Sequence, residues 1–387
     1  MINVKQILMI IVLVSGLIAA DIQALEVDRE VVPRMTLGGR VIATMDAVDL
    51  DSEPEAEDEI NLSDSSLLMR FDKRLFSKGV AGAVVGLTDH ESQVAFNQLH
   101  AFYWNQNYQA QIGRTRLRNT IVEFPLIRDD DLLTYTHVGN GSSNEEFDQI
   151  YGEHIAFDWI FDQKIQMLGV WAGTRRNGED PLFADAPGGI DSYGLGYTYE
   201  QPEDLIYIEK IRHTGLWIDS QEVETAGDSE WMTSVIAGIE FNLNDDPTAS
   251  WSMGIQAIAN NGIDNVASLA SVAERARAKS TSLVASIRYT GRPHLLTRYQ
   301  GAITFAYKDY SDFDNATQWS IAPSAMYRIG QGIDLLAQVK YTDYDSGLVD
   351  GSDTSLYLGI AFSLEAMFND NIGERDSILN LEHSYID

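Results

Sequence analysis

The sequence contains no cysteine, only nine prolines and few basic residues. The absence of cysteine excludes thiolate catalysis and cysteine metal sites. Lys and Arg total 27 against 58 Asp and Glu, and the formal net charge of -31 at pH 7 argues against nucleic acid as a partner. After the first 24 residues, no stretch is long and apolar enough for a membrane-spanning helix. If the mature chain enters a membrane, it does so as strands.

The N-terminal stretch has the order of a secretory signal peptide. Lys5 supplies a basic start, "ILMIIVLVSGLIAA" is the apolar run, and cleavage is predicted after Ala20 or Ala24. The alternative is a membrane anchor, but the run is short for a span of about 20 residues. We therefore expect a signal peptide over 1–24, a transmembrane barrel domain over 25–368 and a C-terminal periplasmic tail over 369–387.

From about Arg34 onward, segments of roughly ten residues alternate apolar and polar side chains. In the stretch 354–368, Leu356 and Leu358 share one face, whereas Ser355, Tyr357 and Gly359 share the other. A soluble β-sandwich also alternates in this way, so the pattern alone predicts strands but not their environment.

The number of strands and the lengths of their connections favour a barrel. Short connections such as 105–107 and 330–332 alternate with long ones such as 119–152 and 260–280, which is typical of outer-membrane barrels. The predicted fold class is all-β: a transmembrane antiparallel β-barrel of about 16 strands, with a long constriction loop after strand 5. The expected strands start near Arg34, Ser65, Val80, Ala95, Tyr108, Glu153, Lys164, Gly189, Leu205, Glu230, Ala249, Thr281, Arg298, Thr317, Gly332 and Thr354.

Three local features refine this prediction. Aromatic residues near strand ends predict girdles at the membrane interfaces, with packing in a core as the alternative; they are Tyr103, Trp104, Tyr108, Trp171, Trp217, Trp231 and Tyr341. In 204–217, Lys210 and Arg212 fall in phase with two isoleucines, which predicts a bulge or an extension beyond the membrane. Pro323 removes one ladder hydrogen bond from its strand.

Basic side chains opposite the apolar face are predicted to line the lumen. Because the first and last strands are neighbours in a closed barrel, these cations would form one wall. The loop 119–152 would face that wall with acidic side chains, and opposed charges would create a transverse field across a constriction. The alternative is that these charges only pair with one another to hold the loop. The predicted cations are Arg40, Arg70, Arg74, Arg114, Arg116, Arg118, Arg288, Lys308, Arg328 and Lys340, and the acids are Glu123, Asp129, Asp130 and Asp131.

The acidic stretch "DLDSEPEAEDE" (49–59) is predicted to form a solvated, flexible outer loop. The alternative is that its carboxylates bind divalent cations and thereby bridge to lipopolysaccharide phosphates. No metal-binding loop of fixed spacing supports this alternative, and we expect no cofactor and no metal site.

The stretch "QAQIGRTRLRNTIVEFPLIRDDDLLTYTHVGNG" resembles the strand and constriction loop of Gram-negative porins, especially the phosphate-selective O and P group. Gly113, Arg114 and Arg116 match the strand of that group, and Phe124 with Pro125 match the turn that follows. The resemblance implies a sixteen-stranded barrel, usually trimeric, that passes small solutes by diffusion. The sequence departs from the group in having inward acids, including Asp158 and Glu240, and in continuing past the last strand at Phe368.

The leading functional hypothesis is a non-enzymatic porin in the outer membrane. Its expected partners are outer-membrane lipid and lipopolysaccharide, small ions and solutes, and two further copies in a homotrimer. A scaffold that sheathes a partner protein or polymer is the second hypothesis. A barrel enzyme is the third, although the sequence lacks the G-x-S-x-G and H-E-x-x-H motifs.

Overall fold

The computed structural model describes residues 34–50, 53–61, 65–75, 79–90, 93–105, 107–116, 121–122, 124–126, 151–161, 166–175, 192–200, 211–224, 229–244, 246, 248–263, 266, 278–294, 297–313, 316–330, 332–345 and 351–368. The regular structure in these residues is β-strand, and no described helix is long and apolar enough to cross a membrane. The first nine strands are β1 (Arg34–Leu50), β2 (Glu53–Asn61), β3 (Ser66–Arg74), β4 (Val80–His90), β5 (Gln93–Trp104), β6 (Tyr108–Arg116), β7 (Tyr151–Phe161), β8 (Gln166–Arg175) and β9 (Ser192–Glu200).

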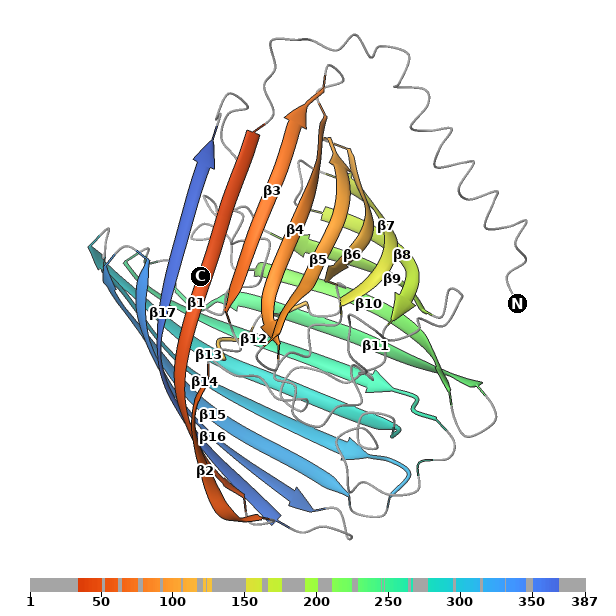
Figure 1. Cartoon of the computed structure of the whole chain (residues 1–387). Coiled ribbons are helices and arrows are strands. Elements are labelled where there is room, and N and C mark those ends of the chain that lie inside the picture. The colour runs from red at the N-terminus through yellow and green to blue at the C-terminus, as the bar shows by residue number, and fades with distance from the viewer. Residues whose placement is uncertain are drawn as a thin grey trace.

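The remaining strands are longer on average. They are β10 (Ile211–Glu224), β11 (Ser229–Asn242), β12 (Ala249–Asn260), β13 (Ser280–His294), β14 (Thr297–Tyr310), β15 (Thr317–Gly330), β16 (Ile333–Asp345) and β17 (Gly351–Phe368). In Figure 1 the long strands β10 to β17 slope across one side of the barrel, and the shorter strands β4 to β9 stand on the other side.

The sheet is antiparallel and closed. Strand β1 pairs with β17 from Met35↔Phe368 to Leu50↔Asp353. On its other edge, β1 pairs with β3 through its first half and with β2 through its second half. Strands β2 and β3 therefore share one position, so the seventeen segments occupy sixteen positions around the barrel. Closure pairs the strand edges that an open sheet would leave exposed.

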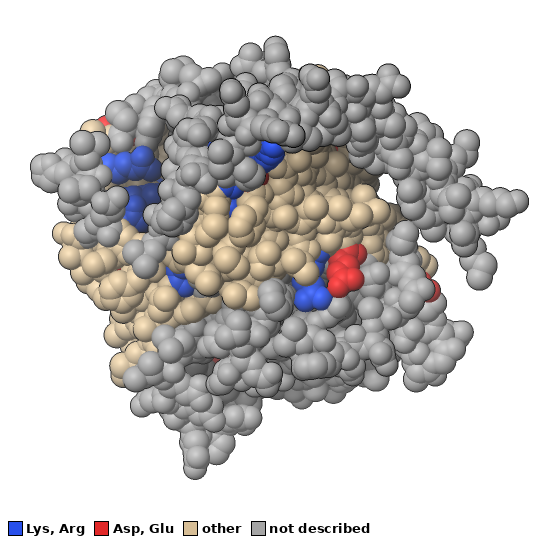
Figure 2. All heavy atoms as spheres, turned by 45° about the horizontal axis from the view of Figure 1, so that its top comes forward, with Lys and Arg blue, Asp and Glu red and all other residues tan. Residues whose placement is uncertain are grey.

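The polarity of the barrel is the reverse of that in a soluble protein. In β14, Ile303 is 49% exposed, whereas Thr304 and Lys308 are at most 3% exposed. In β17, Leu356 and Leu358 are exposed while Ser355 and Tyr357 are buried, as the sequence predicted. The outward face is therefore apolar, and the buried inward face carries many polar side chains. Figure 2 shows that the described part of one face consists mostly of uncharged residues, with basic and acidic side chains at a few places.

Most of the predicted strand starts are confirmed to within three residues. The exception is the strand expected near Leu205, which starts at Ile211 where the structure describes it. A register shift between Ile211 and His213 confirms a bulge at Arg212. Pairing of β15 with β16 is interrupted between Ile321 and Ser324, where Pro323 lacks a donor.

The prediction of a flexible loop over the acidic stretch 49–59 is wrong, because most of its backbone is in β-strands. Strand β1 continues to Leu50, and β2 runs over Glu53–Asn61 against it, with Val48↔Glu57 among the pairs. The backbone of residues 49–50 and 53–59 therefore belongs to two paired antiparallel strands. Backbone hydrogen bonding along the extended β1 outweighs the low strand propensity of this composition.

Short turns between strands are held by local hydrogen bonds. Between β11 and β12, Asp246 Oδ1 accepts from both the backbone N–H and the hydroxyl of Thr248, each at 2.8 Å. These two bonds stabilise the charged carboxylate and lower the pKa of Asp246 below its ordinary value. The turn fixes the register of the two strands that it joins.

An arginine at an outward position should destabilise the barrel in a bilayer. Ile303 lies in the middle of β14, opposite the exposed Ile287. Ile303→Arg should lower the free energy of unfolding from lipid vesicles by about 3 kcal/mol, since it places a charge in hydrocarbon. Urea titration of the vesicle-inserted protein measures this, with Ile303→Leu as the control. Equal stability of the two variants would contradict an outward, lipid-facing position.

Candidate functional site: the barrel lumen

Basic side chains occupy inward positions on six strands around the closure of the sheet. They share the phase of buried polar neighbours such as Thr36 in β1 and Gln338 in β16. Because β1 pairs with β17 on one edge and with β3 on the other, strands β13 to β17, β1 and β3 follow one another around the barrel. The predicted cations whose side chains lie on this basic wall are Arg40 (β1), Arg70 (β3), Arg288 (β13), Lys308 (β14), Arg328 (β15) and Lys340 (β16), and Arg34 (β1) and Arg298 (β14) share their inward phase. Arg74 lies at the end of β3, but its side chain is outside the described part.

Two buried carboxylates pair with arginines on this wall. Asp72 receives the fork of Arg34, with Nε 3.1 Å from Oδ1 and Nη2 3.4 Å from Oδ2. The Nε of Arg70 lies 2.9 Å from Asp72 Oδ2, an ion-pair distance without hydrogen-bond geometry. Asp334 receives a second fork from Arg328, at 2.8 and 3.0 Å. Part of the basic wall therefore does form ion pairs. Its acidic partners there are Asp72 and Asp334, which lie on strands of the wall.

A further ion pair lies at the bulge in β10. Arg212 Nη1 donates to Glu240 Oε1 at 2.7 Å, and Glu240 is 7% exposed on the inward face of β11. In the ladder, Glu240 pairs with Gly254, whose other neighbour is Ser286. The bulge shifts the phase of β10 and so brings Arg212 to the inward side, where the carboxylate can accept from it.

The register of β6 argues against the lumen-facing position predicted for Arg114. Arg114 lies opposite Leu99 in β5 and Glu153 in β7, and it follows Ile112 by two residues. Leu99 and Ile112 are each 56% exposed, so this phase is the outward one. Arg114 Nη2 donates to Glu153 Oε1 at 3.0 Å.

The inward phase of β6 instead carries Gln109, Gln111 and Gly113. Gly113 pairs with His100 on one side and His154 on the other. Its φ of 124° is accessible to glycine and rarely to other residues. The glycine leaves space between two inward histidines at the base of the long loop.

The other predicted pore residues of this region are not described. Arg116 ends β6 opposite Tyr151, without a described side chain. Arg118, Glu123 and Asp129 to Asp131 lie outside the described residues. The acidic side of the predicted constriction therefore stays a prediction.

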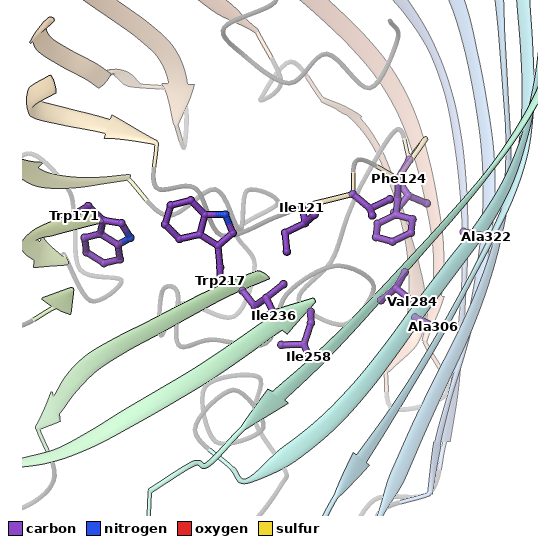
Figure 3. Close-up of a cluster of buried hydrophobic side chains, with 11 residues drawn as sticks. Ile121, Phe124, Trp171, Trp217, Ile236, Ile258, Val284, Ala306 and Ala322 are labelled. Carbon is purple, nitrogen blue, oxygen red and sulfur yellow. The ribbon is translucent and has the colours of Figure 1, made fainter. Parts of the chain in front are cut away.

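Two tryptophans predicted for the interfacial girdles point into the barrel. Trp171 in β8 is 6% exposed and Trp217 in β10 is 3% exposed, and both belong to one buried apolar cluster. Figure 3 shows both rings on the inner side of the strands. The girdle assignment is therefore wrong for this pair, and packing in a core is the correct alternative. Trp231, at 43% exposed, does lie outward.

The same cluster contains a segment from the long connection after β6. Ile121, Val122, Phe124 and Leu126 are each at most 3% exposed and pack against an apolar stripe on the inner wall. In Figure 3, Ile121 lies near Trp217 and Ile236, and Phe124 lies farther along the stripe. The wall residues of the stripe are Trp217 (β10), Ile236 (β11), Ile258 (β12), Val284 (β13), Ala306 (β14) and Ala322 (β15). We call residues 121–122 and 124–126 the docked segment.

A small polar cavity adjoins the two tryptophans. Its lining includes Gln111, His154 and Asp158 from β6 and β7. Asp158 accepts a hydrogen bond of 2.7 Å from Gln109 Nε2, and His154 packs edge-on against Trp171 with 5.9 Å between ring centroids. His154 and Asp158 are thus each engaged with other side chains of the wall.

Comparison with solved structures places this fold among outer-membrane barrels. An anion-selective porin from Comamonas acidovorans matches with a TM-score of 0.60 and 12% identity over 86% of this chain and 100% of that one. OmpF of Salmonella typhi, in complex with daunomycin, matches with a TM-score of 0.58 and 9% identity over 85% and 97%. The outer membrane channel DcaP of Acinetobacter baumannii matches with 0.56 and 12% over 86% and 97%.

At these identities the likeness establishes the fold alone: a closed, sixteen-position antiparallel barrel of the type found in Gram-negative outer-membrane porins. No family model matches the sequence, and no curated protein does. The finer resemblance to the phosphate-selective group therefore stays a prediction.

Neutralising the shared carboxylate of the basic wall should destabilise the barrel. Asp72→Asn leaves the buried Arg34 and Arg70 without their charged partner, so we expect the free energy of unfolding to fall by about 3 kcal/mol. Urea unfolding of the refolded protein in detergent measures the loss. Asp312→Asn, at an exposed acid, is the matched control and should change stability little. If Asp72→Asn unfolds at the same urea concentration as the wild type, the ion pairs of Asp72 contribute nothing to stability.

Proposed function

We infer that the protein is a porin of the Gram-negative outer membrane, forming a water-filled channel for passive diffusion of ions and small hydrophilic solutes. The observation that carries this proposal is the closed barrel with an exposed apolar outer face and a polar, charged inner face. An apolar outer face suits hydrocarbon, and polar inward side chains suit water and solutes. A barrel of sixteen positions encloses more space than inward side chains fill, unlike barrels of about eight strands.

The charges of the inner wall support a preference among the solutes. Around the closure, Arg40, Arg70, Arg288, Lys308, Arg328 and Lys340 share the inward face with the carboxylates Asp72 and Asp334. Guanidinium and ammonium groups on one side of a pore raise the local concentration of anions. With the acids of 119–152 opposite, this wall would face an acidic constriction loop and orient dipolar solutes across the pore. We therefore propose that Arg40, Arg70, Arg288, Lys308, Arg328 and Lys340 line the pathway.

The proposed setting follows from the same fold. The chain would be exported by its N-terminal signal peptide, inserted among outer-membrane lipid and lipopolysaccharide, and assembled as a homotrimer. One structurally similar protein, OmpT of Vibrio cholerae, is described in a trimer form. The outer face has the apolar residues that both lipid and a neighbouring barrel can cover.

The porin proposal predicts stable conductance. Purified, refolded protein added to a planar lipid bilayer should produce discrete current steps with a linear current–voltage relation at low voltage, because ions cross a water-filled pore without a binding step. Heat-denatured protein is the control. Protein that inserts as a folded barrel but carries no current would refute a channel and favour a sheathing scaffold.

The basic wall should control ion preference. Replacing Arg40, Lys308 and Lys340 together by glutamine removes three positive charges from the inward face, so the reversal potential under a KCl gradient should move toward the K⁺ equilibrium potential. Arg114→Gln is the matched control, since Arg114 has the outward phase and pairs with Glu153. If Arg114→Gln shifts the reversal potential as much as the triple variant does, Arg114 lines the lumen after all.

A further inference from the structure

We propose that Gln256, with Gly238 and Gly254 beside it, is a receptor on the inner wall that holds the docked segment permanently in place. The inference rests on the proposed channel function, because a fixed segment inside the lumen sets how much of the cross-section is open to solute. Gln256, Gly238 and Gly254 are positioning residues: they act on the solute through the segment.

The first support is a double hydrogen bond. The backbone N–H groups of Ile121 and Val122 both donate to Gln256 Oε1, at 2.9 and 3.1 Å. Gln256 is 0% exposed on the inward face of β12. A buried N–H without an acceptor is costly, so one side-chain oxygen satisfies two groups that a segment leaving the strand would otherwise leave unpaired.

The second support is a shallow trough made by missing side chains. Gly238 in β11 pairs with Gln256, and Gly254 precedes Gln256 by two residues on the same inward face. A Cβ at Gly254 would lie 2.6 Å from Val122 Cγ1, and a Cβ at Gly238 would lie 2.9 Å from Val122 Cγ2. Only glycine at these positions lets Val122 approach the wall so closely.

The far end of the segment is attached separately. Ser324 Oγ in β15 donates to the carbonyl oxygen of Pro125 at 2.5 Å. Phe124 before this attachment and Leu126 after it are buried against the apolar stripe, at 3% and 0% exposure. The segment is thus hydrogen-bonded at both ends and apolar in between, which gives a fixed element in place of a swinging gate.

The consequence for solute concerns the open side of the lumen. The inner faces of β11 to β15 along the stripe are covered by the docked segment. Solutes therefore pass on the other side of the segment, toward β1 and β3, where Arg40 and Arg70 lie in the inward phase. Releasing the segment would widen the path.

The test uses the full chain with two independent readouts. Gln256→Leu removes the acceptor at nearly unchanged volume, and Gly254→Val adds bulk under Val122. Each should raise single-channel conductance and open-channel current noise relative to wild type. Gln256→Glu keeps an acceptor oxygen for the two backbone N–H groups and should retain the conductance and current noise of the wild type. Gly301→Val is the matched glycine control, since a Cβ there meets nothing within 4 Å.

The second readout does not depend on conduction. Because the chain has no cysteine, Val122→Cys introduces a single thiol, which the docked segment should shield from a water-soluble maleimide. In the background of Gln256→Leu the same thiol should react. Ser311→Cys, at an exposed site, should react in both backgrounds. Folding of each variant is checked by its heat-dependent migration in gels.

The outcomes separate the two proposals. A wild-type protein that inserts but does not conduct overturns the channel, and thiol protection still tests the docking. A conducting wild type whose Gln256→Leu and Gly254→Val variants keep wild-type current and a protected thiol overturns the receptor. A thiol at 122 that reacts in the wild-type background also overturns it.

Discussion

The pairing of β1 with β17 is the contact on which the rest of the structure depends. It converts a sheet with two unpaired edges into a barrel in which backbone groups along the strands have partners, the condition for entering hydrocarbon. It also brings β1 and β3, which carry Arg40 and Arg70, to the side of β17 opposite β16 and β15, which carry Lys340 and Arg328. The basic wall is therefore a product of closure, since these cations are far apart in the sequence.

Strand positions were largely predictable from the sequence, because each strand alternates under a strong constraint. One face is apolar and exposed and the other is largely polar and turned inward, so the period of two is preserved in almost every segment. The irregularities were also readable where they had a local cause, as at Arg212 and Pro323. The β2 hairpin was missed because its stability comes from the extended β1 opposite it, which composition does not reveal.

The errors in the lumen came from assigning residues by type before phase. Arg114 was placed inside for its charge, although the apolar Ala110 and Ile112 share its phase. Trp171 and Trp217 were placed outside for their aromatic character, although Leu216 and Ile218 occupy the alternate, exposed positions beside Trp217. In both cases the alternation of inward and outward positions along the strand predicts the facing that the structure shows. The partner of an inward residue on another strand, such as Asp72 in β3 for Arg34 in β1, depends on the register and cannot be read from one strand.

The apolar stripe inside a polar lumen has a physical reason once the docked segment is considered. Backbone that leaves a strand inside a barrel must bury its N–H and C=O groups against protein, or leave them to water that also carries solute. Gln256 and Ser324 accept from and donate to that backbone, while Ile236, Ile258 and Val284 give its side chains an apolar surface. The stripe and the segment are complementary halves of one small core. This barrel thus encloses two kinds of interior: a polar one along the basic wall, and an apolar one in which the docked segment packs.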